Sequence, residues 1–483
     1  LVTGVQTCAL PICNLFVWTA NLLGSSAKGN DFFNKYLLGT EHTVFAEEEG
    51  PTRPTEIKWR EQEELQKPGG AAEGKLDLLI DIDFRMAGTA LYSDVVLPTA
   101  TWYEKDYISS TDMHPFVHPF QAAVDPLWEA KSDWDVLRTL AEAVSKVAKE
   151  AELKPYEDLV AVPIGHDSEG ETAQPEGLVR DWSKGECEPI PGKTMPNLVP
   201  VKRDYAKTYE KWIALGPNVS KKMGSLAMTW DSSDEYEEIR QRNGVIENED
   251  FVSYGMPSIY DARQAVEAVM GLSTTTNGKV AVKAFKSLNE KTGLKGLEHL
   301  AKDRENERFT FDEIAAQPKE TITSPTFTGS NQGRRYTPFT TNIEELVPFR
   351  TVTGRQSFYL DHEMMREYGE TMATFKPILY YRPIKNLLGG AKEITLKYLT
   401  PHNKWSIHSM YFDSQQMLTL FRGGQTVWMS EKDAREIGVR DNDWIELYNH
   451  NGVVTSRVAV SPRIPQVTVF MHHAQDCHIN VPA

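Results

Sequence analysis

The segment from Thr400 to Ser409, TPHNKWSIHS, concentrates hydrogen-bonding side chains in ten residues. His402 and His408 are six residues apart, so both would face the same side of an extended strand, a spacing compatible with a two-histidine metal site. No third ligand is evident, and the density of donors predicts instead that the segment anchors a phosphate or a polar heterocycle. Two hydrogen-bonded surface histidines would give the same pattern, which leaves both interpretations open.

Asp83 follows an apolar run, Leu76 to Ile82, that predicts a buried strand. A second strand is expected at Val95 to Leu97, stopped by Pro98. In open α/β sheets, ligands bind beyond the carboxyl ends of the strands, and a carboxylate there suits the N–H edge of a guanine or a ribose hydroxyl. A loop or helix-cap role for Asp83 is the alternative.

The stretch from Met471 to His478 holds three histidines, an acid and a thiol in eight residues, a composition found in metal sites. An adjacent His-His pair cannot easily direct both rings at one ion from a strand, which argues against a metal. Cys477 beside His478 could form a thiol–imidazole nucleophile, but no third orienting group is evident. The stretch therefore predicts neither a metal site nor a cysteine nucleophile.

Charge balance, hydropathy and cysteine spacing exclude several classes of protein. The 483 residues carry 52 Lys and Arg against 68 Asp and Glu, a formal charge of −16, with no long basic run, which argues against a nucleic-acid partner. No segment reaches the roughly 18 apolar residues of a membrane-spanning helix. The four cysteines form no C-x-x-C pair, so neither a disulfide framework nor a four-cysteine iron–sulfur site is predicted.

The elements that must position these residues fall into four segments. Residues 1–13, LVTGVQTCALPIC, are interpreted as non-native adapter sequence. Residues 14–150 alternate strands, loops and a helix, and Ser132 with Asp135 forms a capping box, which predicts an open α/β sheet. Residues 151–344 are polar and weakly periodic, apart from a helix expected near 261–270, and predict an irregular, loop-rich insertion. Residues 345–483 predict a β-dominated domain, with a hairpin between 444 and 460.

The run Leu91 to Lys105, LYSDVVLPTATWYEK, closely resembles the respiratory nitrate reductases of the molybdopterin oxidoreductase family, of dimethyl-sulfoxide reductase type. The resemblance extends from Asn14 to the last residue. Its further anchors are Met113–Pro115, Glu129–Trp134, Thr353–Gln356, Leu399–Ser409, Arg422–Gly424 and Asp441–Trp444. It implies part of an α/β molybdopterin-dinucleotide-binding domain, then the irregular insertion, then a truncated double-psi β barrel.

The resemblance also implies roles for individual residues. Asp83 would hold the guanine end of one molybdopterin guanine dinucleotide, and Asn21 would approach the same cofactor from the loop after the first strand. Where the family has a Thr four residues beyond the acid, this chain has Ala87, with Thr89 close by. The other dinucleotide would be wrapped by one loop, whose candidate residues are Thr400, His402, Asn403, Lys404, Trp405, Ser406 and His408.

Two late residues, His473 and Asn480, match positions that face the pterin. His402 stands where many family members have an Arg, a departure that the nitrate reductases share. No protein ligand to the metal and no catalytic residue is expected in this chain, because the family supplies the metal ligand from an N-terminal portion that also binds a [4Fe–4S] cluster.

The implied activity is the reduction of nitrate to nitrite in anaerobic respiration, at molybdenum held by two molybdopterin guanine dinucleotides. The implied partners are an iron–sulfur electron-transfer beta subunit and, through it, a membrane cytochrome b subunit, which predicts a peripheral location at the cell membrane, on its cytoplasmic face. Two alternatives stay open: nitrite oxidation by a relative of the same family, or a catalytically inert binding module when the chain is isolated.

Overall fold

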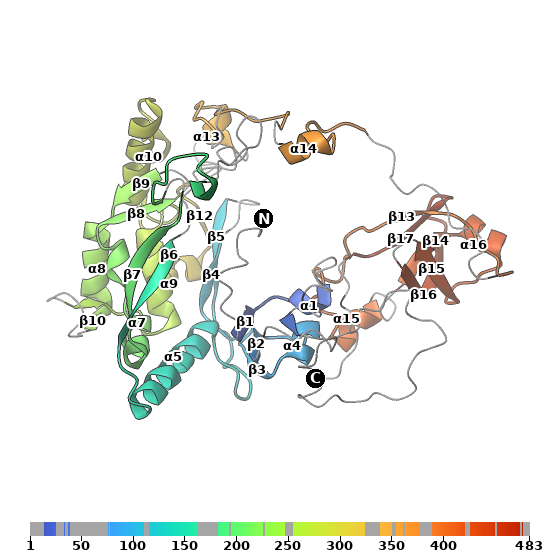
Figure 1. Cartoon of the computed structure of the whole chain (residues 1–483), viewed down its shortest axis with the longest axis horizontal. Helices are drawn as coiled ribbons and strands as arrows, with labels where there is room; N and C mark the ends of the chain where they lie inside the picture. Colours follow the sequence, from blue (N-terminus) through green and yellow to red (C-terminus); the bar gives the residue numbers. More distant parts are fainter. Residues whose placement is uncertain are drawn as a thin grey trace. The chain divides into compact units, whose positions relative to one another are not determined.

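Two units make up the chain in its computed structural model (Figure 1). The first combines residues 1–99 with 377–483, and the second spans residues 100–376. The structure describes residues 14–25, 33, 37–38, 76, 78–110, 115–162, 182–192, 195–225, 228–246, 255–323, 339–349, 354–360, 363–375, 389–420, 426–449, 452–473 and 476. The predicted adapter sequence, residues 1–13, lies outside them.

The first unit contains a parallel sheet of three strands in the order β1-β2-β3 (Figure 1). The strands are β1 (Asn14–Trp18), β2 (Leu78–Asp83) and β3 (Val95–Pro98), and the short helices α1 (Leu22–Ser25) and α4 (Gly88–Tyr92) follow β1 and β2. All pairings are parallel, as expected for an α/β fold, so the carboxyl ends of the strands meet at one edge. The strand predicted before Asp83 is confirmed.

A second, mixed sheet of five strands lies in the same unit, in the order β13-β17-β14-β16-β15. Its strands and the helices between them are β13 (Lys397–Leu399), α15 (Gln415–Leu420), β14 (Thr426–Ser430), α16 (Glu431–Ile437), β15 (Trp444–Asn449), β16 (Gly452–Ser461) and β17 (Thr468–Met471). β15 and β16 form the predicted hairpin, with Asn449 opposite Gly452. The described strands form an open sheet around the buried residues Val427, Met429, Val458 and Val469.

The second unit begins with β4 (Tyr107–Ser109), β5 (Phe116–Phe120) and the long helix α5 (Asp133–Glu150). As predicted, Ser132 caps α5 by accepting a hydrogen bond from the Asp135 amide. The elements that follow are β6 (Tyr156–Val162), β7 (Asn197–Arg203), α7 (Thr208–Trp212), β8 (Lys222–Ser225), β9 (Met228–Asp231), α8 (Ser233–Asn243), β10 (Val245–Ile246), β11 (Met256–Pro257), α9 (Ala262–Leu272), α10 (Gly278–Thr292), α11 (His299–Lys302), α12 (Phe311–Ala316), β12 (Lys319–Glu320), α13 (Thr340–Ile343) and α14 (Glu363–Glu367).

The segment 151–344 differs from the expected irregular insertion. Helix α9 matches the one helix expected there, but α8 and α10 were not predicted, and α10 supplies much of the largest buried cluster among the described residues. Its buried side chains include Val280, Ala284, Phe285 and Leu288, which follow helical spacing. The polar residues between them cover the outer face, so average composition concealed a periodic apolar stripe.

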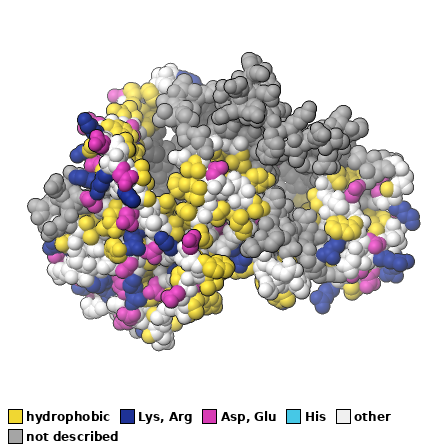
Figure 2. Space-filling view, turned by 90° about the horizontal axis from the view of Figure 1, so that it is seen from below, with side chains coloured by type: hydrophobic (Ala, Val, Ile, Leu, Met, Phe, Trp, Pro, Cys, Tyr) yellow, Lys and Arg dark blue, Asp and Glu magenta, His cyan; other side chains and the backbone are white. Residues whose placement is uncertain are grey.

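The described helices include none that is both long and apolar enough to cross a membrane. On the face displayed in Figure 2, acidic and basic side chains are intermixed.

Candidate functional site

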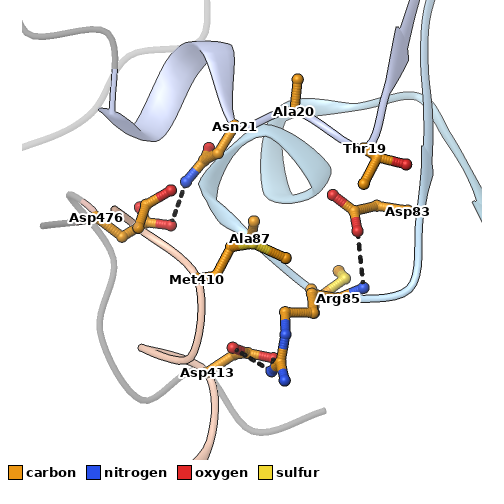
Figure 3. Close-up of a pocket in the computed structure, with 11 residues that line it drawn as sticks. Thr19, Ala20, Asn21, Asp83, Arg85, Ala87, Met410, Asp413 and Asp476 are labelled. Atoms are coloured by element: carbon orange, nitrogen blue, oxygen red, sulfur yellow. Dashed lines mark hydrogen bonds and ion pairs between the residues drawn. The ribbon is translucent and has the colours of Figure 1, made fainter. Parts of the chain in front are cut away.

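A small pocket in the first unit, lined by several polar side chains, lies beyond the carboxyl ends of β1 and β2 (Figure 3). Parallel pairing brings these two strand ends together, as expected for a ligand site in an open α/β sheet. Its lining comes from the loops after the two strands and from two late segments of the chain. The lining residues are Thr19, Ala20, Asn21, Asp83, Arg85, Met86, Ala87, Ser409, Met410, Asp413 and Asp476.

Asp83 is one of two buried carboxylates in the lining of this pocket, with 7% of its surface exposed. Its Oδ1 accepts hydrogen bonds from the amides of Phe84 at 2.7 Å and Arg85 at 3.2 Å. Burial raises the pKa of Asp83, while these two amides and the Arg85 guanidinium oppose the rise. A carboxylate held this way can accept hydrogen bonds from a planar N–H edge.

Arg85 joins the loop after β2 to the segment 409–413. Its Nη1 donates to both carboxylate oxygens of Asp413 at 2.9 Å, and the guanidinium lies 3.9 Å from the centre of the Tyr411 ring. Tyr411 has φ +78° and His408 has φ +50°, an uncommon conformation for residues other than glycine. The ion pair and the stacked ring therefore hold a turn that its own backbone preferences disfavour.

Asn21 is the centre of a polar network in the same pocket. Its Oδ1 accepts hydrogen bonds from the Gly24 amide, the Thr89 amide and the Thr89 hydroxyl, at 2.9 to 3.0 Å. Its Nδ2 donates to Asp476 at 2.6 Å. Thr89, which the sequence places near the position of the family Thr, therefore contacts Asn21.

Three histidines of the first unit form a cluster: His402, His408 and His473. Their ring centres lie 4.3 to 5.9 Å apart, and His473 Nε2 is 3.3 Å from His408 Nδ1. His402 and His408 face each other although β13 ends at Leu399, so a turn in the loop, and not the strand alternation we expected, brings them together. The part of the chain that the structure describes contains no group of three or more His, Cys, Asp or Glu arranged to hold a metal.

The loop between β13 and this turn contains the remaining candidates. Asn403 accepts a hydrogen bond from the Trp405 amide at 2.9 Å, while its Nδ2 is buried and the described residues offer it no hydrogen-bond partner. Lys404 lies 4.7 Å from the centre of the Trp405 ring. Thr400 is exposed and Ser406 is half-buried. Asn480, Cys477 and His478 lie outside the described residues.

Arg85, Asp413 and Asp476 are pocket residues that the sequence did not single out. Arg85 meets Asp413 across 328 positions of the chain, and Asn21 meets Asp476 across 455. No local pattern signals such pairs. The only hint was the position of Asp476 within a stretch noted for its histidines.

Three family models match the chain. They are molybdopterin oxidoreductase over residues 47–143, nitrate reductase alpha chain domain V over residues 221–344, and the molybdopterin dinucleotide binding domain over residues 396–481.

Similar curated proteins include the nitrate reductase alpha chain of Bacillus subtilis, 59% identical over 473 residues, or 97% of this chain and 38% of that protein. The respiratory nitrate reductase 1 alpha chain of Escherichia coli is 45% identical over 478 residues, 97% of this chain and 37% of that protein. The perchlorate reductase subunit alpha of Dechloromonas aromatica is 26% identical, over 84% of this chain and 31% of that protein. The chain thus spans a little over a third of the length of the nitrate reductase relatives.

Among solved structures, the acetylene hydratase of Pelobacter acetylenicus matches with a TM-score of 0.40 at 13% identity, covering 83% of this chain and 34% of that one.

Proposed function

We propose that this chain is part of a nitrate reductase alpha chain of the molybdopterin oxidoreductase family, and that it forms part of the site that holds a molybdenum bis(molybdopterin guanine dinucleotide) cofactor in an enzyme that reduces nitrate to nitrite. The observation that carries the proposal is the buried Asp83 carboxylate at the carboxyl edge of the parallel sheet. The identity of 44 to 59% to several nitrate reductase alpha chains supports nitrate as substrate over nitrite.

The residues present fit this cofactor. Asp83 offers an acceptor for guanine N–H groups. The buried Asn403 Nδ2 has no hydrogen-bond partner within the described structure, and an unpaired buried donor costs free energy. The residues beside Asn403 in its loop also carry many hydrogen-bond donors. A ligand with phosphate or pterin acceptors would satisfy it. The described donors and acceptors therefore suit a polar dinucleotide.

The residues that would hold the cofactor fall into two sets. Asp83, with Asn21 nearby, would hold one guanine end, and the other dinucleotide would meet Thr400, His402, Asn403, Lys404, Trp405, Ser406, His408, His473 and Asn480. When bound, the cofactor supplies the electron transfer and oxygen-atom removal that convert nitrate to nitrite. The chain's own contribution is to bind the cofactor, orient it and exclude water.

The wider assembly follows from the same proposal. The five-stranded sheet would belong to a double-psi β barrel, since residues 396–481 match the dinucleotide binding domain. A [4Fe–4S] cluster in the intact subunit would pass electrons from an iron–sulfur beta subunit, itself served by a membrane cytochrome b subunit. The enzyme would be peripheral to the cell membrane, on the cytoplasmic face.

A chimera tests the proposal. Residues 14–483 would replace the homologous segment of the Bacillus subtilis nitrate reductase alpha chain, which is 59% identical. We expect the purified chimera to contain molybdenum and guanine nucleotide and to form nitrite from nitrate with reduced viologen. Asp83→Ala should lose guanine nucleotide, whereas Glu436→Gln, on the exposed face of α16, should not. A folded chimera without molybdenum or guanine nucleotide would overturn the proposal.

A further inference from the structure

The carboxylate of Asp476 lies buried between two loops of the first unit, with 3% of the residue exposed. Its Oδ2 accepts two hydrogen bonds, from Asn21 Nδ2 at 2.6 Å and from the Gly88 amide at 2.9 Å. Figure 3 shows the Asp476 side chain directed at Asn21. One oxygen therefore joins the loop after β1 to the first residue of α4, the helix that follows β2.

The other oxygen, Oδ1, lies against two glycines. A Cβ built on Gly24 or on Gly88 would come within 2.5 Å of Asp476 Oδ1, a distance that real Cβ atoms do not show. Neither glycine has a positive φ, so backbone conformation does not require glycine at either position. At Gly88 the Asp476 carboxylate needs this space, and at Gly24 the Asn21 amide, also within 2.5 Å of the added Cβ, needs it as well.

The hydrogen bonds to Asn21 Oδ1 fix the orientation of the Asn21 side-chain amide. Its Oδ1 is held by three donors from Gly24 and Thr89, so its Nδ2 must face Asp476. Thr89 in turn accepts a hydrogen bond from the Leu23 amide at 3.1 Å. Within the described part of this network, Asp476 Oδ2 is the acceptor that Asn21 and Gly88 share.

We infer that Asp476 is a positioning residue, which clamps the loops that carry Asn21 and Gly88 to the segment that carries His473, three residues earlier in the chain. The clamp itself depends only on the contacts above. Its consequence for cofactor binding rests on the proposed function: one carboxylate would set the spacing between the Asp83 side of the site and the histidine cluster.

Three variants separate the clamp from general stability. Asp476→Asn can place its amide oxygen where Oδ2 lies and so keep both hydrogen bonds. Asp476→Ala removes the acceptor that Asn21 and Gly88 share, and Gly88→Ala fills the space that the carboxylate occupies. Glu436→Gln is the surface control. A double-mutant cycle between Asn21→Ala and Asp476→Ala measures the coupling directly.

The first readout uses the full chain without cofactor. We expect the Gly88 amide to exchange hydrogen at least tenfold faster in Asp476→Ala, with near-parental rates in Asp476→Asn and Glu436→Gln. The effects of Asn21→Ala and Asp476→Ala on the exchange rate of the Gly88 amide should be non-additive. Unchanged exchange at Gly88 together with an additive cycle would overturn the inference.

The second readout uses the chimera. Asp476→Ala and Gly88→Ala should retain at least tenfold less guanine nucleotide, and Asp476→Asn should restore most of it. Full retention in Asp476→Ala, beside loss in Asp83→Ala, would overturn the positioning role and leave the proposed function standing. A parent chimera without guanine nucleotide would overturn the proposed function, while hydrogen exchange still decides whether the clamp exists.

Discussion

Asp81 provides the sharpest test of the energetics of the parallel sheet. It lies in the middle of β2, in register with Val17 of β1 and Val96 of β3. The side chain has no exposed surface, and neither carboxylate oxygen has a hydrogen-bond partner among the described residues. Alternation along the strand places it on the same face as Asp83. Burial, with a smaller contribution from the charge of Asp83, raises the pKa of Asp81 from 3.8 to about 7.

The sign of the pH dependence follows from this rise. Because the pKa of Asp81 is higher in the folded state, the folded chain binds one proton more than the unfolded chain between pH 3.8 and about 7. The stability that protonated Asp81 contributes is fully present below pH 3.8 and is lost as pH rises through 7. At about 1.4 kcal/mol per pH unit, the loss is on the order of 4 kcal/mol.

The perturbation is Asp81→Asn, which keeps the shape of the side chain and cannot ionise. We expect parent and variant to have similar stability near pH 4, and the variant to be more stable by up to about 4 kcal/mol at pH 8. Protection factors of the β1 and β2 amides, measured by hydrogen exchange at both pH values, report this unit separately from the rest of the chain. Glu446→Gln, an exposed carboxylate on β15, is the matched control.

A difference between parent and Asp81→Asn that stays the same at pH 4 and pH 8 would refute the reasoning. A titration of the Asp81 carboxyl group, monitored by carbon NMR, would refute it independently if its midpoint lay near 4. Either result would mean that the carboxylate is solvated or paired in solution.

Three further predictions concern the pocket and the histidine cluster. In the full chain, Asp83→Ala should weaken the binding of GDP about tenfold to a hundredfold, since a hydrogen bond to a charged group contributes roughly 1.5 to 3 kcal/mol, and should leave the binding of ADP unchanged. Equal effects on the two nucleotides, measured by calorimetry, would contradict the assignment of guanine to Asp83. In the chimera, replacing His402 and His408 together by Gln, which keeps an amide donor, should preserve more molybdenum and nitrate turnover than replacing both by Ala. Equally severe losses in the two double variants would favour the two-histidine metal site instead. Arg85→Lys should lower the free energy of unfolding by about 1 to 2 kcal/mol, because Lys can replace neither the planar stacking on Tyr411 nor the geometry of the largely buried ion pair with Asp413. Thermal unfolding measures the effect, and an equal effect of the exposed control substitution Arg435→Lys would contradict this reasoning.

Local signals in the sequence predicted those parts of the fold that short-range interactions decide. Ser132 before α5 and Ser430 before α16 each accept a hydrogen bond from an amide three residues later, so both caps are visible in a four-residue window. The apolar run before Asp83 predicted β2, since a central parallel strand is buried on both faces. The apolar stripe of α10 is equally local, but the many polar residues of the segment 151–344 hide it in the average composition.

The candidate site was only half predictable. The sequence identified Asp83 at the end of a strand and a donor-rich loop around His402, because residue types and strand ends are local properties. Their roles toward a cofactor stay predictions. That His473 would join the loop histidines depended on where β17 ends relative to the loop after β13, which the parallel pairing of these two strands sets.

The tertiary structure alone decided the pairings that close the pocket. Asp476 meets Asn21 across 455 positions, and its carboxylate fits only because Gly24 and Gly88 leave room for it. It also revealed that the Asp81 carboxylate is buried and has no hydrogen-bond partner in the described part of the chain, although the surrounding sequence is typical of a buried strand. A hydrogen bond between distant residues and the desolvation of a carboxylate both depend on which surfaces the fold brings together, and no short window of sequence contains that information.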